Sequence, residues 1–342
     1  MKLVETLVVR DDKEMLEAHL AFQLAMGVDL VIAAVARRND DGVAEVIERY
    51  ERDGVLRLVA VDGGSRADGD IRRELDRLAV AEHGADWVLG AEADELWLPR
   101  GESLPAILSF IPPRYSVVQA LVRVFPPRPA ADGQPFWERM TVRPSLLSPE
   151  AIAEPLERAL RWVRRGTLVR DRATPVPLRA WYPIEVLRFP LRSVEQVVRR
   201  LEEGVHPPRS ALEDAAAALH AGQRLAASWA DVEVDADAEV RGLADGSLVV
   251  DERARQVLEA LRASDTASGG TSLARAPSSR PTATPPPGIV EDATYAVECA
   301  AVGEVDLDLL WSHIAALEQH LALLEQRFWT RVQRRLERLV RR

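Results

Sequence analysis

Four short apolar runs alternate with segments of helical period over the first 100 residues of the chain. The runs cover residues 3–9, 30–35, 56–61 and 87–89, and each leads into polar or glycine-rich residues. Continuous apolar strands that alternate with amphipathic helices are typical of a parallel sheet with both faces covered. The alternation therefore predicts an α/β fold, a doubly wound and mostly parallel sheet with its polar clusters along one edge.

The fourth apolar run ends in three carboxylates and a tryptophan, because Glu92, Asp94 and Glu95 precede Trp97. In an open α/β sheet, ligands bind beyond the carboxyl ends of the strands. Glu92 and Asp94 are two residues apart, so in an extended segment both side chains leave the same face. Carboxylate oxygens bind hard divalent cations, and the pair predicts a site for Mg²⁺ or Mn²⁺. The alternative is a solvated acidic turn that caps the next helix.

Charge and composition narrow the classes of partner. The 342-residue chain has 44 basic and 54 acidic residues and a formal net charge of −10. Nucleic-acid binding requires an excess of Lys and Arg, so we predict no nucleic-acid partner.

Cys299 is the single cysteine, which rules out an intrachain disulfide and fits a reducing compartment. The sequence has no apolar window of about 18 residues and no signal-peptide pattern, so we expect a cytoplasmic protein.

Changes in composition divide the chain into three predicted segments. Residues 1–262 form the α/β domain, with residues 1–100 as one half and residues 101–262 as a second half that ends in closing helices. Residues 263–290 are rich in Ser, Thr, Ala, Gly and Pro. Such a segment buries too little apolar surface to offset its ordering entropy, so we predict a disordered linker. Residues 291–342 form a C-terminal helical segment.

The C-terminal segment has the apolar spacing of a coiled coil. Its heptad positions are Leu310, Ile314, Leu317, Leu321, Leu324 and Phe328. The spacing predicts a homo-oligomer that forms through residues 306–342. The last sixteen residues contain seven arginines against one glutamate. This charge predicts weak contact with an anionic membrane surface, and the alternative is a solvated helix end whose cations suit the helix dipole.

Three motifs in this order resemble bacterial family-2-type glycosyltransferases of the GT-A fold, over residues 1–261. The first is Leu-Val-Val-Arg-Asp-Asp at residues 7–12. Glu-Ala-Asp-Glu-Leu-Trp at residues 92–97 is similar to the family's Asp-Ala-Asp-Glu-Phe-Trp, and Arg-Phe-Pro-Leu-Arg-Ser at residues 188–193 is similar to His-Phe-Pro-Leu-Arg-Ser. The resemblance implies transfer of a sugar from a nucleoside-diphosphate sugar to a hydroxyl acceptor, either a glycan or another cell-envelope component.

The resemblance also implies roles for particular residues. It places the nucleotide in the half formed by residues 1–100. Glu92 and Asp94 would hold Mn²⁺ or Mg²⁺, and Glu95 is the nearby carboxylate that would deprotonate the acceptor hydroxyl. Arg188, which stands at a position where the family has another residue, is the candidate that would stabilise the departing diphosphate directly. The expected nucleotide-binding residues are Arg10, Asp11, Asp12, Asp41 and Arg192. The alternatives are a helix N-cap at Asp11 and Asp12, an ordinary turn at Asp41 and surface salt bridges at Arg192.

The sequence departs from the family pattern at three of the expected site positions. Ala36 stands where the family has aspartate, Glu92 replaces the first aspartate of its metal motif, and Arg188 replaces a histidine. An arginine at position 188 places a fixed positive charge where a cation is expected. Two readings follow: Arg188 replaces the metal and neutralises the diphosphate, or it pairs with Glu92 or Asp94 and the metal site is lost. The alternative function is a catalytically degenerate relative that acts by binding or oligomerisation through its C-terminal helix.

Overall fold

The computed structural model describes residues 1–9, 13–35, 42–60, 68–129, 134–145, 160–179, 181–194, 196, 229, 233–267, 295 and 297–300. The chain divides into two compact units, Met1–Asp292 and Ala293–Arg342. The predicted coiled coil and almost all of the predicted linker lie outside the described residues, as do Arg10, Asp11, Asp12, Ala36 and Asp41.

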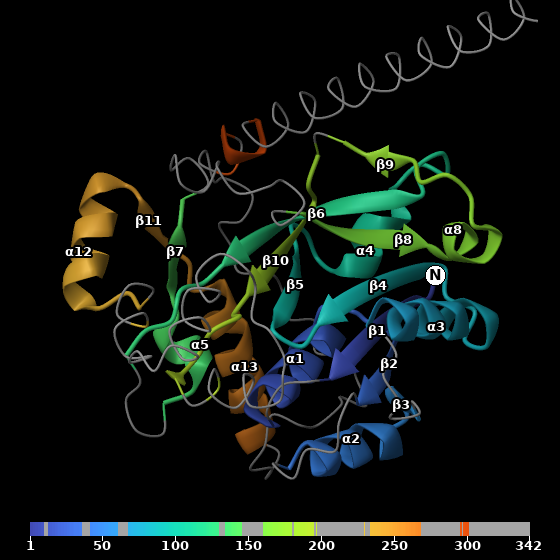
Figure 1. Ribbon diagram of the computed structural model, residues 1–342, viewed down its shortest axis with the longest axis horizontal. Coiled ribbons are helices and arrows are strands. Elements are labelled where there is room, and N and C mark those ends of the chain that lie inside the picture. Colours follow the sequence, from blue (N-terminus) through green and yellow to red (C-terminus); the bar gives the residue numbers. More distant parts are fainter. Residues whose placement is uncertain are drawn as a thin grey trace, which may run out of the picture. The chain divides into compact units, whose positions relative to one another are not determined.

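The first unit begins with strands and helices that alternate along the chain, as the apolar runs predict (Figure 1). These elements are β1 (Leu3–Val9), α1 (Lys13–Ala25), β2 (Leu30–Val35), α2 (Val43–Arg52), β3 (Leu56–Val59), α3 (Asp68–Ala81) and β4 (Trp87–Glu92). The later elements are β5 (Glu95–Pro99), α4 (Leu104–Ser109), β6 (Val117–Val124), α5 (Phe136–Arg139), β7 (Val142–Pro144), β8 (Leu160–Arg165), α8 (Gly166–Asp171), β9 (Pro177–Leu178), β10 (Ile184–Arg188), α12 (Ala236–Asp245), β11 (Leu248–Val250) and α13 (Arg253–Ala267).

The main sheet has the strand order β3-β2-β1-β4-β8-β6-β10-β5, and β9 pairs with β6. Strands β3, β2, β1 and β4 are parallel, which confirms the predicted mostly parallel α/β sheet. Strand β8 runs antiparallel between β4 and β6, and β5 runs antiparallel to β10. Strand β5 follows β4 after two residues yet joins the sheet beyond β10. The chain therefore crosses the carboxyl edge of the sheet at the three carboxylates.

Both faces of the β1 region are buried. Leu3 and Leu7 of β1 belong to a large core that includes residues of α1, α2 and α13. Val4 and Val8 belong to a second core, which contains Ile71 and other residues of α3. Successive side chains of a strand point to opposite faces, so an uninterrupted apolar strand requires a helical layer on each side.

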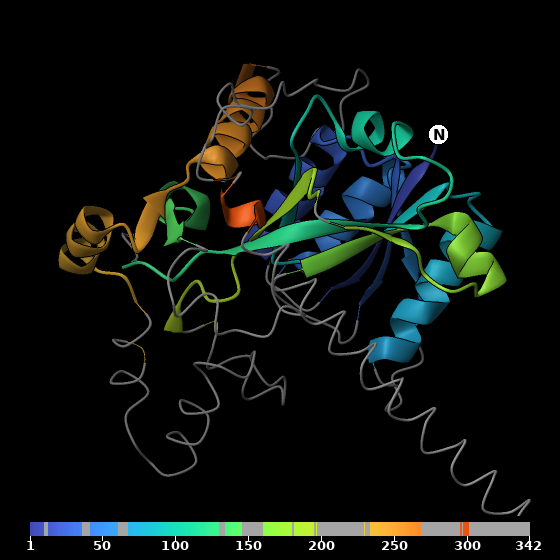
Figure 2. The ribbon, with the colours of Figure 1, turned by 90° about the horizontal axis from the view of Figure 1, so that it is seen from above.

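Strands β7 and β11 form a separate antiparallel ribbon that lies with α12 at one end of the unit, away from α3 (Figure 2). The last of the predicted closing helices, which the sequence pattern places at residues 249–261, begins in β11 and becomes helical only at Arg253. Residues 142–144 are extended and pair with β11, so the first residues of this segment are bound as a strand.

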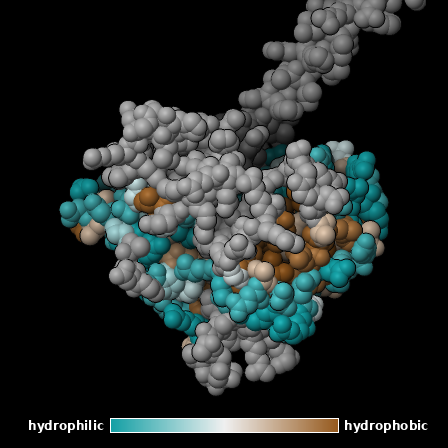
Figure 3. All heavy atoms as spheres, turned by 60° about the horizontal axis from the view of Figure 1, so that its bottom comes forward, coloured by the Kyte–Doolittle hydropathy of each residue, from teal (hydrophilic) through white to brown (hydrophobic). Residues whose placement is uncertain are grey.

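The described surface is polar with local apolar areas, one of which Figure 3 shows in brown. Trp97 and Trp137 are buried, whereas Trp162 and Trp181 are 50% and 49% exposed. Among the described residues, no helix is both long and apolar enough to span a membrane.

Candidate functional site

The three carboxylates lie at the junction between β4 and β5. Glu92 is the last residue of β4, Asp94 lies in the turn, and Glu95 is the first residue of β5. The end of β10 reaches the same place, because Glu95 pairs with Arg188 in the sheet. The backbone amide of Phe189 also donates a hydrogen bond to the carbonyl of Asp94 over 2.9 Å. Backbone pairing thus brings Arg188 to carboxylates that precede it by more than 90 residues.

Each carboxylate of the junction lies beside an arginine from a different element. Arg72 of α3 is 2.5 Å from Glu92 Oε1, and Arg161 of β8 donates from Nε to Glu95 Oε1 over 2.6 Å. Arg188 Nε lies 3.5 Å from Asp94 Oδ2 and 3.9 Å from Glu95 Oε1. We name these six residues the carboxylate–arginine cluster: Arg72, Glu92, Asp94, Glu95, Arg161 and Arg188. Their formal charges, three negative and three positive, cancel.

The carboxylates differ in what they can offer a ligand. The Glu95 side chain is 1% exposed, and its two oxygens accept from Arg161 and from the backbone amide of Glu92. The Asp94 side chain is 5% exposed, and its Oδ1 is buried without a hydrogen-bond partner among the described residues. A buried acceptor without a donor costs about 1–3 kcal/mol, so a bound donor at Oδ1 would be stabilised.

Glu92 is the accessible carboxylate of the cluster, with a side chain that is 42% exposed. Desolvation of its carboxylate raises the pKa of Glu92, and repulsion from Asp94 and Glu95 adds to this effect against attraction by Arg72 and Arg188. A carboxylate that solvent reaches and whose pKa is raised suits proton transfer better than a buried carboxylate that already accepts two hydrogen bonds. Glu92 and Glu95 therefore differ in their access to solvent, and the predicted role of Glu95 as the base stays a prediction.

Arg188 is a fixed positive charge. Burial acts to lower its pKa, but the carboxylates of Asp94, Glu95 and Glu92 outweigh burial and raise it. Toward the carboxylates of Asp94 and Glu95, the guanidinium of Arg188 presents its Nε. The guanidinium carries five N–H donors in a planar fork. Its outer N–H groups therefore have the chemistry to donate hydrogen bonds to anionic oxygens.

Two buried polar side chains of α1 contact β5 and β1 next to the junction. Gln23 of α1 donates from Nε2 to the carbonyl of Glu95 over 3.2 Å. His19, one helical turn earlier, lies 2.5 Å from Glu5 of β1, and both side chains are fully buried. Burial opposes protonation of His19, but Glu5 outweighs it and raises the pKa of the imidazole. These two contacts fix the position of α1 relative to β5 and to β1, next to the cluster.

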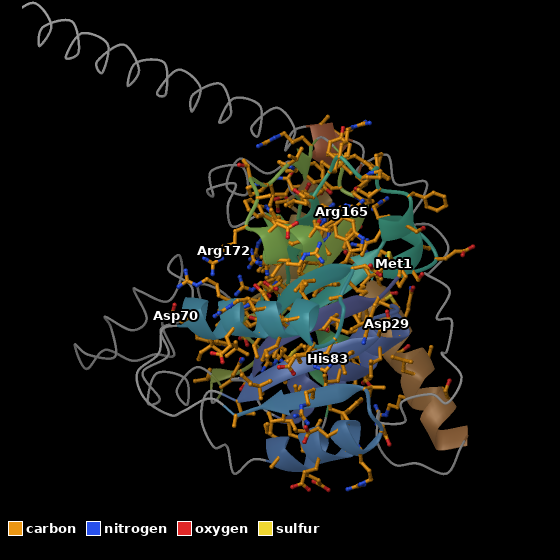
Figure 4. All side chains as sticks on the ribbon, turned by 90° about the vertical axis from the view of Figure 1, so that its right-hand side faces the viewer. Met1, Asp29, Asp70, His83, Arg165 and Arg172 are labelled. Atoms are coloured by element: carbon orange, nitrogen blue, oxygen red, sulfur yellow. The ribbon has the colours of Figure 1, made fainter. Side chains whose placement is uncertain are left out.

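A second polar group lies on the α3 side of the sheet. Arg164 of β8 donates to Asp76 of α3 over 2.7 Å, and Thr6 of β1 donates to the other oxygen of Asp76 over 2.9 Å. Gly90 of β4 lies beside this group, and a Cβ atom built there would be 3.4 Å from Arg164 Nη2, which is ordinary contact distance. Figure 4 shows the two edges of the sheet: Met1 and Asp29 mark its amino side, and Asp70, at the start of α3, lies at the opposite side.

The remaining residues that the sequence predicts fall into two groups. Arg10, Asp11, Asp12 and Asp41 lie outside the described residues, so their nucleotide-binding role stays a prediction. Arg192 is buried and donates to the carbonyl of Phe189, while its guanidinium lies over the Phe136 ring at 5.7 Å. Both of these partners lie outside the carboxylate–arginine cluster. The role of Arg192 in nucleotide binding likewise stays a prediction.

Sequence reasoning missed Arg72 and Arg161. Neither belongs to a motif, and each is one of several arginines in its own helix or strand. Arg72 reaches Glu92 because α3 packs beside β4, and Arg161 reaches Glu95 because β8 inserts next to β4. The sequence holds one weak signal for them, since three clustered carboxylates in a partly buried turn require compensating charge.

The cluster is a poor fit for a divalent cation. Among the described residues, no group of three or more His, Cys, Asp or Glu side chains is arranged to hold a metal ion. Two unit charges about 4 Å apart interact by about 4 kcal/mol at an effective dielectric constant of about 20, and a divalent charge doubles that value. A cation bound by Asp94 would meet this repulsion from Arg188, whose Nε lies 3.5 Å from Asp94 Oδ2.

Comparison with known proteins gives a weak likeness of fold. No family model and no curated protein matches the sequence. A mannosyltransferase from Pyrobaculum calidifontis, in complex with GDP-Man and Mn²⁺, is 12% identical, and the match covers 91% of this chain and 87% of that protein with a TM-score of 0.37. Mannose-1-phosphate geranyltransferase from Thermus thermophilus is 17% identical, with 68% and 70% covered and a TM-score of 0.26. Both are transferases by name, but likeness at these values carries no argument about the chemistry of this chain.

Proposed function

We propose that this protein binds a nucleoside-diphosphate sugar at the β4–β5 junction and transfers the sugar to a hydroxyl of a glycan or another cell-envelope acceptor. One observation carries the proposal. A buried acceptor without a partner among the described residues, Asp94 Oδ1, lies on the same carboxylate that faces the Arg188 guanidinium. A sugar phosphate is complementary to this pair, since it offers a hydroxyl donor and anionic oxygens on adjacent atoms.

The position of the pair supports the same ligand. Asp94 and Arg188 lie where β4 and β10 end, and ligands of open α/β sheets bind beyond the carboxyl ends of the strands. In the proposed complex a ligand hydroxyl donates to Asp94 Oδ1, and the guanidinium of Arg188 donates to phosphate oxygens. A guanidinium that donates to the departing diphosphate stabilises the negative charge that develops there. The resemblance of residues 1–261 to family-2-type glycosyltransferases agrees with this ligand class.

In the proposed reaction the acceptor hydroxyl attacks the anomeric carbon of the donor sugar. The bond from that carbon to the diphosphate breaks with its electron pair on the leaving oxygen, and the bond to the acceptor oxygen forms. Glu92 takes the hydroxyl proton, because it is the carboxylate of the cluster that solvent reaches. Glu95 holds Arg161 and the Glu92 amide instead, and so positions the turn.

The first prediction concerns nucleotide affinity, measured by titration calorimetry of the full chain with UDP, GDP and dTDP. We expect one of the three to bind, and we expect Arg188→Ala to weaken that nucleotide about 10- to 100-fold, since a hydrogen bond to a charged group contributes about 1.5–3 kcal/mol. Asp94→Ala should weaken binding of the corresponding nucleotide sugar. Asp171→Ala is the control, because that side chain is 57% exposed and pairs with its neighbour Arg170. Absence of binding by all three nucleotides would exclude the proposal.

A second function is favoured by a separate observation, the neutralisation of each carboxylate by an arginine. A cluster whose charges already cancel is also what a binding protein without catalytic activity would retain. Release of the nucleoside diphosphate from the bound nucleotide sugar separates the two functions. The transferase releases the nucleoside diphosphate when water or an added acceptor takes the sugar, whereas the degenerate relative binds the nucleotide sugar and leaves it intact.

A further inference from the structure

We infer that Arg188 is the built-in cation of this site, so that the cluster excludes divalent metal ions and binds a diphosphate without one. The inference deepens the proposed function and rests on it for the identity of the ligand. The charges involved are those of the six cluster residues, all of which are among the described residues. The alternatives are a bound divalent cation and the guanidinium of Arg188 as the positive charge that contacts the phosphates.

The Asp94 carboxylate faces an arginine where a metal site would need a free oxygen. A carboxylate that serves a divalent cation must present its oxygens to the ion and not to a fixed positive charge. Asp94 Oδ2 instead faces Arg188 Nε at 3.5 Å. Arg188 is also 3.9 Å from Glu95, so one guanidinium lies against two of the three carboxylates.

The second carboxylate that a metal would need is also engaged. Glu92 Oε1 lies 2.5 Å from Arg72 of α3, and the same arginine donates to the carbonyl of Ala91 over 3.3 Å. Arg72 is thereby anchored at the end of β4 by a backbone contact as well as by the ion pair. A cation shared by Glu92 and Asp94 would have to displace two arginines, each held by an element of the fold.

The geometry of Arg188 suits the replacement. Its backbone is fixed by sheet pairing, since Arg188 is opposite Glu95 of β5 on one side and Val124 of β6 on the other. Its side chain is 21% exposed, so the guanidinium is anchored and still reachable. Nε faces the carboxylates, and the planar fork of arginine can present its remaining N–H groups to two phosphate oxygens at once. A lysine would keep the charge but not the paired contact.

The test measures binding of Mn²⁺ alone to the full chain by electron paramagnetic resonance, without any nucleotide. Wild-type protein should leave the Mn²⁺ signal unchanged. Arg188→Met removes the charge and retains much of the side-chain length, so it should gain Mn²⁺ affinity by at least about tenfold. Arg188→Lys keeps the charge and should stay unable to bind Mn²⁺. Arg170→Met is the matched control, because Arg170 is exposed and pairs only locally with Asp171 among the described residues.

A second measurement requires no variant. Calorimetry of wild-type protein with the nucleotide that binds should give the same dissociation constant in EDTA and in Mn²⁺. Mn²⁺ binding by the wild type, an unchanged Mn²⁺ affinity in folded Arg188→Met, or nucleotide binding that is lost in EDTA would each overturn the inference. If no nucleotide binds under any condition, the proposed function fails, and the Mn²⁺ titration alone then decides whether the cluster excludes metal ions.

Discussion

At the scale of single residues, close backbone approach limits substitution more sharply than burial does. Gly166 follows β8 and begins α8. Its amide donates to the carbonyl of Asp86 over 2.8 Å, and a Cβ atom at this position would lie 2.1 Å from the carbonyl oxygen of Ala85. This contact ties the end of β8 to the chain that enters β4. No side chain can occupy the position without moving one of the two segments.

We therefore expect Gly166→Ala to lower the free energy of unfolding by about 1–3 kcal/mol, the usual range for a forced backbone shift. Gly69→Ala is the control, because no atom lies within 4 Å of a Cβ built at Gly69. It should leave stability unchanged or raise it slightly, since alanine is the better helix former. Urea unfolding of the three proteins checks this. Equal loss of stability in both variants would show that the steric argument is wrong.

At the scale of elements, a buried ion network joins strands that are distant in sequence. Glu185 of β10 accepts from Arg100 after β5, from Arg123 of β6 and from Arg253 at the start of α13, over 2.6 to 2.7 Å. Burial opposes ionisation of Glu185, but Arg253, Arg123 and Arg100 outweigh it and hold its pKa far below the ordinary 4.5. The carboxylate thus links two strands to the helix that closes the domain.

The network predicts a pH-dependent loss of stability. A carboxyl group with a lowered pKa in the folded state stabilises the fold above its unfolded pKa, and this contribution is lost as the pH falls toward the folded pKa. Glu185→Gln should lower the free energy of unfolding at pH 7 by about 3–5 kcal/mol, since it removes the buried negative charge that three arginines share. The difference from wild type should shrink progressively as the pH falls below 4.5.

Denaturant unfolding between about pH 3 and pH 7, a range that brackets the ordinary pKa of a glutamate carboxyl group, measures this difference. Glu45→Gln is the matched control, because Glu45 pairs with Lys13 at the surface with 72% of its side chain exposed. Exposed ion pairs contribute little, so this variant should follow the wild type at every pH. A Glu185→Gln difference that does not change with pH would refute the electrostatic explanation.

At the scale of the whole molecule, the fold unit Met1–Asp292 and the C-terminal unit Ala293–Arg342 are separate compact parts. The site belongs entirely to the first unit. The second unit contains the heptad pattern of residues 310–328. Oligomerisation and any catalytic activity are therefore expected to reside in different parts of the chain.

If the heptad residues form a coiled coil, deletion of residues 289–342 should yield a monomer, measured by light scattering. Leu317→Asp in the full chain should have the same effect, because a charge at a seam position opposes coiled-coil association. Replacement of an exposed arginine of the first unit, such as Arg170, serves as the control and should leave the mass unchanged. An unchanged mass after the deletion would remove the coiled-coil prediction.

The sequence by itself determined the layered α/β fold of the first unit. Residues 3–9 and 30–35 are uninterrupted apolar runs, and their strands have those bounds because only a sheet covered on both faces buries such runs. The same local pattern located Glu92, Asp94 and Glu95 where the fourth apolar run ends, which is the β4–β5 junction, and a sequence motif singled out Arg188.

Only the tertiary structure decided which charges meet. Arg72 and Arg161 join the cluster through the packing of α3 and the insertion of β8, and Asp94 faces Arg188 through the pairing of β10 with β5. Likewise, Trp97 of β5 is buried and Trp162 of β8 is half exposed, although both residues lie in strands of the same sheet. Local pattern depends on neighbours along the chain, whereas ion pairing and burial depend on neighbours in space that strand order brings together.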